Sequence, residues 1–153
     1  MQKLPTTPMK FTARNDYAFK KLFGTEENKD IMIEFLSLVT LLSKDDFDDV
    51  RIENSEYIPR FYNDKIGRLD IKIRLHDGRK IDVEMQNTYF DYYPKRSIFY
   101  CSKLIHEHFM SGFQYTQLKK CIAINVLNSP FKLSGKIHSI YQIRERDEQT
   151  LLD

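Results

Sequence analysis

The stretch GRLDIKIRLHDGRKIDVEMQ, residues 67–86, decides the fold because it reads as two amphipathic strands joined by a turn. Side chains alternate between the two faces of a strand. One face of this hairpin is apolar, and it carries Leu69, Ile71, Ile73, Leu75, Ile81, Val83 and Met85. The other face is polar, and it carries Asp70, Lys72, Arg74, Asp82, Glu84 and Gln86. The pattern therefore predicts a hairpin that buries its apolar face.

The length of the turn determines which residues lie opposite each other. A two-residue turn would bring Asp70 opposite Met85 and would mix polar with apolar side chains on both faces. A three-residue turn over residues 76–78 keeps each face uniform, and Gly78 suits the left-handed position in such turns. Because the buried face selects the register, we expect the three-residue turn, which sets Asp70 opposite Glu84.

Two opposed carboxylates need an explanation, since directly opposed residues have Cβ atoms ~4.5–5.5 Å apart. Asp70 and Glu84 would repel each other unless something positive lies between them. A shared proton would raise one pKa, and a divalent cation such as Mg²⁺ or Mn²⁺ would suit the hard oxygen ligands. A solvated polar face with neighbouring lysines or arginines is the third explanation. The hairpin alone leaves all three open.

Apolar spacing predicts three helices around the hairpin. The first lies in NDYAFKKLFG, residues 15–24, where Asn15 or Asp16 can cap the start and Gly24 can end the helix. The second covers residues 28–42, and the third lies in residues 93–112 and closes at Gly112.

Further strand signals run from Val50 to Phe61, and KKCIAINVLN, residues 119–128, is a continuous apolar run typical of a buried central strand. We expect a last strand over residues 136–144. The acidic cluster in residues 45–49 lacks EF-hand spacing, so we interpret it as a solvated loop. The element order predicts an α/β fold with a mixed central β-sheet flanked by helices.

Composition limits the class of protein. The chain has 153 residues and a net charge of +2, which suits one domain and means that any basic patch is local. Cys101 and Cys121 lie in apolar runs without a CxxC motif, so we expect buried free thiols in a reducing cytoplasm. No stretch has the length of a signal-peptide core or a membrane span. We therefore expect a cytoplasmic protein.

The order Asp, hairpin, Glu-x-Gln resembles the PD-(D/E)XK nuclease superfamily, in which a metal-binding Asp precedes a Glu-x-Lys. More narrowly, the chain resembles the recombination-promoting nuclease or putative transposase branch. Three other stretches share this resemblance: NDYAFKKLFG, KRSIFYCSKL and GFQYTQLKKCIAINVL. Gln86 departs from the superfamily, where Lys is usual, but this branch often carries Gln there. The resemblance implies a restriction-endonuclease-like core.

The resemblance also implies a site. Asp70, Glu84 and the Met85 backbone carbonyl would bind Mg²⁺ (or Mn²⁺), and Gln86 would orient a water by hydrogen bonds. Arg96 and Tyr100 lie four residues apart and share a helix face. We expect both to contact nucleic acid, although helix packing is the alternative for each.

Two other residues have open roles. Lys72 is either an extra cation at the site or the partner of Asp82 in an ion pair. Asp16 is either a third carboxylate or a helix cap.

The leading functional hypothesis is a Mg-dependent DNA endonuclease linked to recombination or transposition. The alternatives are a nucleic-acid-binding module of the same fold with little or no catalysis, and an interaction domain in which Asp70 and Glu84 are structural. A homodimer is compatible with double-strand cleavage. For the domains, we expect a flexible N-terminal arm over residues 1–13 and a single nuclease-like domain over residues 14–153. We also expect that the chain lacks a C-terminal region found in longer members of the branch.

Overall fold

The computed structural model describes residues 16–53, 71–88, 90–110, 112, 114–128 and 134–152. Its helices are α1 (Asp16–Phe23), α2 (Lys29–Thr40) and α3 (Tyr93–Met110), with short 3-10 helices η1 (Glu26–Asn28), η2 (Lys44–Phe47) and η3 (Tyr115–Gln117). Its strands are β1 (Arg51–Glu53), β2 (Ile71–Arg74), β3 (Lys80–Gln86) and β4 (Cys121–Leu127). The expected arm over residues 1–13, and the strand signals beyond residue 53, lie outside the described residues.

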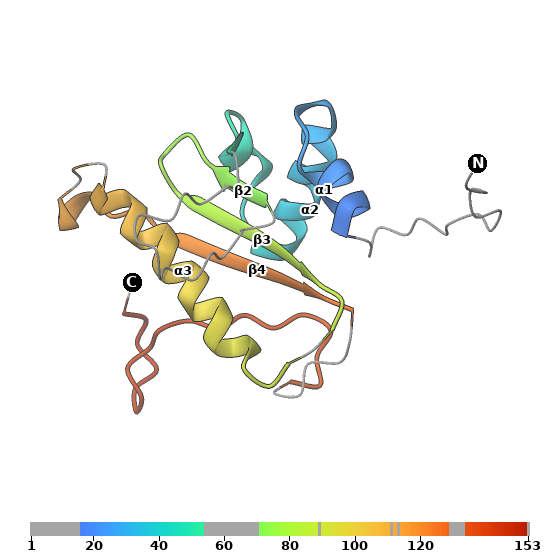
Figure 1. The fold of residues 1–153 in the computed structure, drawn as a ribbon. Coiled ribbons are helices and arrows are strands. Elements are labelled where there is room, and N and C mark those ends of the chain that lie inside the picture. Colours follow the sequence, from blue (N-terminus) through green and yellow to red (C-terminus); the bar gives the residue numbers. More distant parts are fainter. Residues whose placement is uncertain are drawn as a thin grey trace, which may run out of the picture.

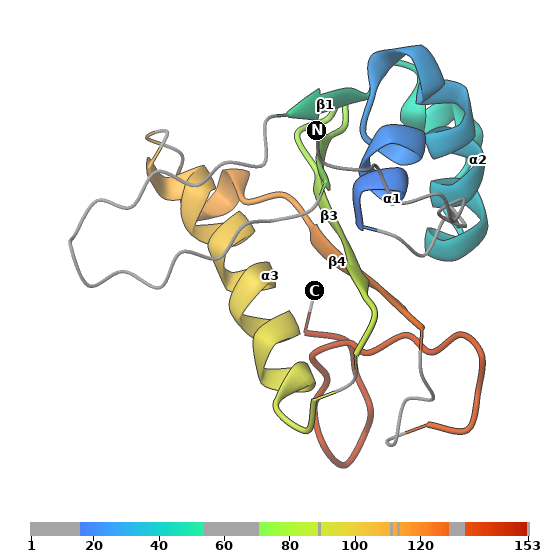
Figure 2. The same ribbon diagram turned by 45° about the vertical axis from the view of Figure 1, so that its right-hand side comes forward.

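The four strands form one mixed sheet in the order β1-β2-β3-β4 (Figure 1). β1, β2 and β3 pair antiparallel, whereas β4 lies parallel to β3. Figure 2 shows the sheet nearly edge-on, with α1 and α2 on one side and α3 on the other. The predicted α/β architecture, a mixed sheet flanked by helices, is therefore confirmed.

The hairpin of β2 and β3 closes with the predicted three-residue turn. The Leu75 amide donates to the Arg79 carbonyl over 2.9 Å, and the Gly78 amide donates back to the Leu75 carbonyl over 3.0 Å. Gly78 has a φ of 91°, in the left-handed region that favours glycine. Along the strands, Ile71 lies opposite Val83. The register inferred from the apolar face is correct for every pair that the structure describes.

The apolar face of this hairpin forms the main core with α1 and α2. The buried residues of this core come from both helices, from the segment after α2 and from the two strands: Phe19, Met32, Leu36, Phe47, Val50, Ile71, Ile73, Leu75, Ile81 and Val83. The Met85 side chain packs against the same core. This continuous apolar cluster supplies the main driving force for folding, because it removes large aliphatic and aromatic surfaces from water.

The polar face is also covered. Lys80, Asp82 and Glu84 on β3 are buried, and α3 supplies the buried residues Tyr100 and Leu104 to a second, smaller cluster. Pro94 is tolerated at the start of α3 because the first turn of a helix does not use its backbone N–H groups. The expected solvated polar face is therefore wrong for this part of the hairpin, whereas the neighbouring arginine that this explanation also expected is present, since Arg96 forms an ion pair with Glu84.

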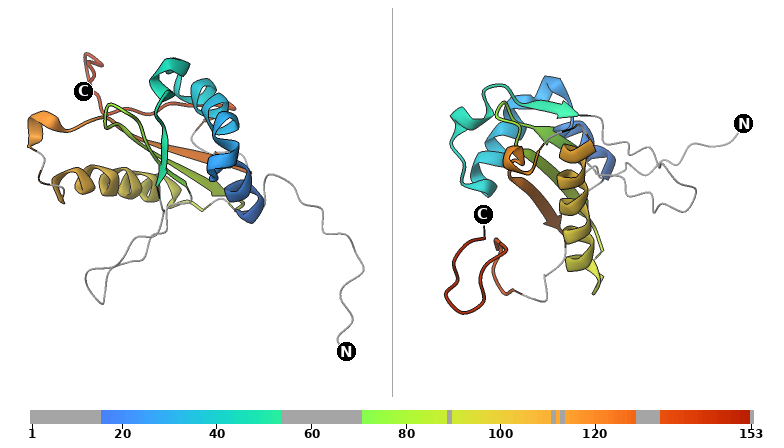
Figure 3. Two further views of the ribbon diagram at one scale, coloured as in Figure 1. Left: turned by 90° about the horizontal axis from the view of Figure 1, so that it is seen from above. Right: turned by 90° about the vertical axis from the view of Figure 1, so that its left-hand side faces the viewer.

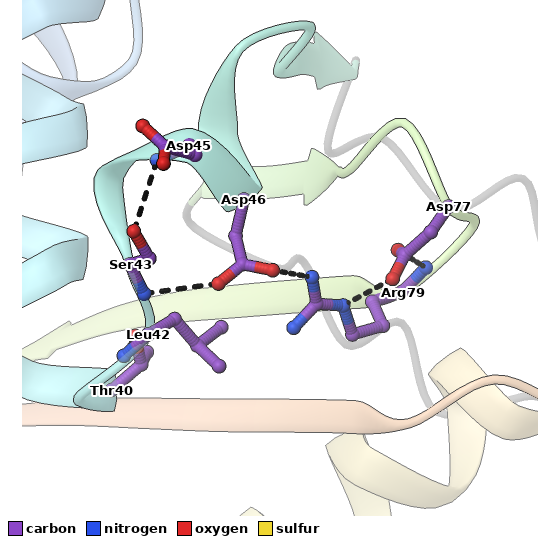
Figure 4. A network of polar contacts seen from close by, with 7 residues as sticks. All are labelled: Thr40, Leu42, Ser43, Asp45, Asp46, Asp77 and Arg79. Carbon is purple, nitrogen blue, oxygen red and sulfur yellow. Dashed lines mark hydrogen bonds and ion pairs between the residues drawn. The ribbon is translucent and has the colours of Figure 1, made fainter.

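The acidic segment after α2 is a helix cap that also holds the hairpin turn (Figure 4). The Ser43 hydroxyl and the Asp46 carboxylate form a capping box on η2, and the Ser43 amide donates to Asp46 over 2.9 Å. Asp46 also forms an ion pair with Arg79, which is held on its other side by Asp77. The hydrogen bond from Arg79 lowers the pKa of the Asp46 carboxyl. Asp45, Asp48 and Asp49 are exposed, as expected for a solvated segment, but residues 44–47 form the 3-10 helix η2 rather than a loop, and Phe47 is buried in the core.

Two predictions at the C-terminal end are wrong. β4 is the last strand of the described sheet, and all its residues are only half-buried, so it is not a buried central strand. Residues 136–144 form no strand; residues 134–152 contain only an isolated bridge between Arg144 and Leu151. Figure 3 shows this segment as an open loop outside the sheet.

Among the helices in the described part of the chain, none is long and apolar enough to cross a bilayer.

The two cysteines lie where α3 packs against β4. Both thiols are free and half-buried, and the Cys101 Sγ lies 3.8 Å from the backbone oxygen of Cys121. Burial raises the pKa of both thiols, that of Cys121 to about 12. The predicted free thiols are thus confirmed, although neither is fully buried.

An ion-pair cluster ties α3 to the sheet. Glu107 on α3 contacts Lys72 on β2 over 2.5 Å and Lys80 on β3 over 3.2 Å. Lys72 also pairs with Glu53 on β1 over 3.0 Å. Burial acts to raise the pKa of the Glu107 carboxyl, but the hydrogen bond and charge of Lys72, with those of Lys80, outweigh it and lower the pKa. One carboxylate therefore joins three elements.

We expect the substitution Glu107→Gln to lower the free energy of unfolding by about 1–2 kcal/mol, because it leaves two shielded ammonium groups without this carboxylate. Urea denaturation of the full chain measures the change. Glu34→Gln is the matched control, since Glu34 pairs with Lys44 on the exposed surface. A loss for Glu107→Gln no larger than for Glu34→Gln would contradict the assigned role.

The stabilising effect of Glu107 should also depend on pH. Its folded-state pKa lies below the unfolded value of 4.5, so its stabilisation is present above that value and is lost as pH falls through the folded pKa. Urea denaturation of wild type and Glu107→Gln across acidic and neutral pH tests this. The stability difference between the two should be constant near neutrality and should shrink at acidic pH; a difference that grows on acidification would refute the assignment.

Candidate functional site

Four polar side chains meet where α3 crosses the end of β3. The Arg96 guanidinium lies at their centre. Its Nη2 donates to Oε2 of Glu84 over 3.0 Å, its Nη1 donates to Oε1 of Gln86 over 3.1 Å, and its Nε donates to the Tyr100 hydroxyl oxygen over 3.0 Å. Arg96 thereby joins the two polar residues of β3 to a tyrosine of its own helix.

Local periodicity explains this arrangement. Glu84 and Gln86 are two residues apart on β3, so they share the face beneath α3. Arg96 and Tyr100 are four residues apart on α3, so they lie on one side of the helix. The sequence predicted each pair separately. It did not predict that Arg96 contacts both members of the β3 pair, because that depends on how α3 docks on the sheet.

The electrostatics of the site follow from burial. Glu84 is only 1 % exposed, so its charge is sustained by the ion pair with Arg96. Burial acts to lower the pKa of Arg96, but its interactions with Tyr100 and with the Glu84 carboxylate outweigh it and raise the pKa. Burial raises the pKa of the Tyr100 hydroxyl, and the negative charge of Glu84 raises it further. The tyrosine is therefore a neutral hydroxyl group near neutral pH.

The Gln86 amide is held at both ends. Its Oε1 accepts from Arg96, and its Nε2 donates to the backbone carbonyl of Thr88 over 2.9 Å. These contacts define which end of the amide faces the guanidinium. They also place a cation directly beside the position at which the superfamily pattern has lysine.

A polar contact that the sequence reasoning missed supports the start of α3. Asn125 on β4 lies opposite Glu84 in the parallel register. Its Oδ1 accepts from the Tyr93 hydroxyl over 3.0 Å, and its Nδ2 donates to the Ser97 hydroxyl over 2.8 Å. The signal was present in the sequence, since Asn125 is the one polar residue inside the apolar run CIAINVL.

The metal-site prediction is only partly within the described structure. In the segments described, no group of three or more His, Cys, Asp or Glu side chains could hold a metal ion. Asp70 lies outside the described residues, directly before the first residue of β2. Glu84 and the Met85 backbone supply oxygen donors, the type that Mg²⁺ and Mn²⁺ prefer. The donor chemistry fits a hard divalent ion, and the predicted ligand set remains a prediction.

The two residues with open roles are less central. Lys72 lies opposite Asp82 as predicted, and it forms ion pairs with Glu53 and Glu107, which favours a structural role. Asp16 is the first residue of α1, and its side chain lies outside the description.

The comparisons with known proteins agree with this architecture. Residues 13–153 match the family model described as PD-(D/E)XK nuclease family transposase. No curated protein and no solved structure matches the chain significantly. The mixed sheet flanked by helices is consistent with a restriction-endonuclease-like fold. PD-(D/E)XK nucleases generally use divalent metal ions, and a nuclease family implies a DNA substrate. Because the match spans nearly the whole sequence, the chain belongs to the PD-(D/E)XK nuclease family of transposases.

Proposed function

We propose that the protein is a metal-dependent, cytoplasmic DNA endonuclease that hydrolyses phosphodiester bonds in recombination or transposition. The observation that carries this proposal is the buried Glu84 carboxylate, held beside Gln86 by Arg96 at the junction of β3 and α3. The register of the hairpin adds support. Since Ile71 lies opposite Val83, continuing the pairing by one residue would bring Asp70 opposite Glu84.

In this proposal Asp70, Glu84 and the backbone carbonyl of Met85 would hold a divalent metal ion. When bound, such an ion lowers the pKa of a coordinated water and offsets negative charge on the scissile phosphate. Gln86 orients the attacking water through its amide, but it cannot act as a titrating base. Tyr100 stabilises the guanidinium through the hydrogen bond from Arg96 Nε.

Arg96 would supply the positive charge that a lysine supplies in the usual superfamily pattern. Its guanidinium already contacts Gln86 and Glu84, so a lysine at position 86 would bring a second cation against it. A planar guanidinium binds phosphate through two parallel hydrogen bonds. Arg96 is therefore both the positioning residue for Glu84 and Gln86 and a candidate phosphate contact.

The substitutions Glu84→Gln and Asp70→Asn should each reduce DNA nicking by about 100-fold or more, because each removes a proposed ligand of the metal ion. Conversion of supercoiled plasmid in the presence of Mg²⁺ or Mn²⁺ measures the rate.

Glu34→Gln, on the exposed surface of α2, should cleave like wild type. Thermal melting of each variant separates lost chemistry from lost folding. Wild-type nicking by well-folded Glu84→Gln would remove Glu84 from the site.

A charge exchange tests the role of Arg96. Gln86→Lys alone should lower nicking by about tenfold or more, because the new ammonium lies against the guanidinium. The double variant Gln86→Lys/Arg96→Gln should recover part of that loss, since it restores a single cation between the strand and the helix. Nicking rates of both single variants and the double variant form a double-mutant cycle. Strictly additive losses would show that the two positions do not share the charge.

A second function is favoured by one contact. The buried Glu84 carboxylate forms an ion pair with the Arg96 guanidinium, and Gln86 has no titratable group, an arrangement that also suits a nucleic-acid-binding module with little or no catalysis. Such a module would give a salt-dependent mobility shift with DNA in the absence of cleavage.

A homodimer, measured by light scattering, would provide two sites for cutting both strands of a duplex.

A further inference from the structure

An exposed pair of aromatic rings precedes α3. Phe90 and Tyr92 stack nearly parallel, with ring centroids 5.1 Å apart and an interplanar angle of 8°. Phe90 is 38 % exposed and Tyr92 is 55 % exposed. We refer to these two rings as the aromatic platform. Large aromatic surfaces at this exposure are typical of binding surfaces rather than of a core.

The aromatic platform is held by its backbone. The Tyr93 amide donates to the Phe90 carbonyl over 2.9 Å, and the Arg96 amide donates to the Tyr92 carbonyl over 3.1 Å. Tyr93 itself is buried, and its hydroxyl donates to Asn125 on β4. The turn that carries the two rings is therefore fixed to both the helix and the sheet, so little conformational entropy is lost when a flat ligand binds.

The aromatic platform also lies next to the candidate site along the chain. The segment that carries it connects Gln86, at the end of β3, to Arg96, in the first turns of α3. The hydrogen bond from Gln86 to Thr88 holds the beginning of this connection, and the amide of Arg96 holds its end. A ligand that contacts Arg96 is thus one helical turn from Tyr92.

The charges on α3 indicate the kind of ligand. Glu107 is the one acidic residue of this helix, and it is engaged by Lys72 and Lys80. The helix also presents basic groups, such as the exposed Lys95, alongside the exposed apolar side chains of Ile98 and Phe99. Asp91, between the two rings in sequence, is acidic, so the attraction for an anion comes from the helix. Flat rings beside a basic helix suit a nucleotide, whose base stacks while its phosphate meets the cations.

We propose that the aromatic platform stacks on an unpaired base beside the cleaved phosphate, so that the substrate is DNA with single-stranded or locally unpaired nucleotides. This rests on the proposed function for its choice of DNA. In an intact duplex both faces of each base are covered by its neighbours, so only an unstacked base offers a face to the rings.

The test uses the full chain in EDTA, so that binding is measured without cleavage. The probes are a single strand containing 2-aminopurine, whose fluorescence is quenched on stacking, and a fully paired duplex of the same sequence. Wild type should quench the fluorescence and prefer the single strand by about tenfold. The variant Phe90→Leu/Tyr92→Leu should lose the quenching and the preference, because leucine keeps apolar volume but has no π-face.

Tyr115→Leu is the matched control, since Tyr115 is an exposed aromatic on η3. Retention of the single-strand preference by the double variant would overturn the proposal, and so would equal losses in the control. If wild type is a dimer and the double variant is a monomer, the two rings instead form an interface with a second copy of this chain, and the stacking proposal is overturned. Nicking with Mg²⁺ is measured separately. If wild type quenches the fluorescence but does not nick DNA, only the proposed nuclease activity is rejected. If wild type nicks DNA and the double variant keeps the single-strand preference, only the proposed role of the aromatic platform is rejected.

Discussion

The register of the β2–β3 hairpin is the constraint on which the rest of the structure depends. Side chains alternate with a period of two, so a slip of one residue would exchange the contents of the two faces. The turn at Gly78 prevents that slip by closing the hairpin with three residues. It thereby directs the isoleucines toward α1 and α2 and directs Glu84 and Gln86 toward α3. A glycine at the far end of the hairpin thus decides which side chains can form the site.

Covering the polar face has an energetic consequence. Placing α3 over Asp82 and Glu84 removes carboxylates from water, which is costly unless cations accompany them. Near the start of α3, Arg96 forms an ion pair with Glu84. Farther along the helix, Glu107 forms ion pairs with Lys72 and Lys80 of the sheet. These ion pairs make the docking of α3 specific, because any other placement would leave charges buried without partners. The same guanidinium therefore serves both the helix packing and the candidate chemistry.

Much of this was accessible from the sequence because it is local. Alternation, turn length and the preference for glycine at position 78 were sufficient to derive the hairpin and its register. The apolar run in residues 119–128 was misassigned to a central strand, since hydrophobicity reports burial tendency and says nothing about how many neighbours a strand has. The strand expected over residues 136–144 likewise finds no partner strand within the described part of the chain. The contact between Arg96 and Gln86 depends on helix docking, which no local pattern encodes.

The thiol pair at the α3–β4 contact has a practical consequence. With a pKa of about 12, Cys121 is a thiolate in only about one molecule in 10⁵ near neutral pH. Alkylating reagents react with the thiolate, so labelling of this residue is slow while the helix stays packed on the strand. Separation of the two elements would return the thiol toward its ordinary acidity and speed the reaction. The rate at which Cys121 is alkylated in the native chain therefore reports how often α3, the helix that covers Glu84, separates from β4.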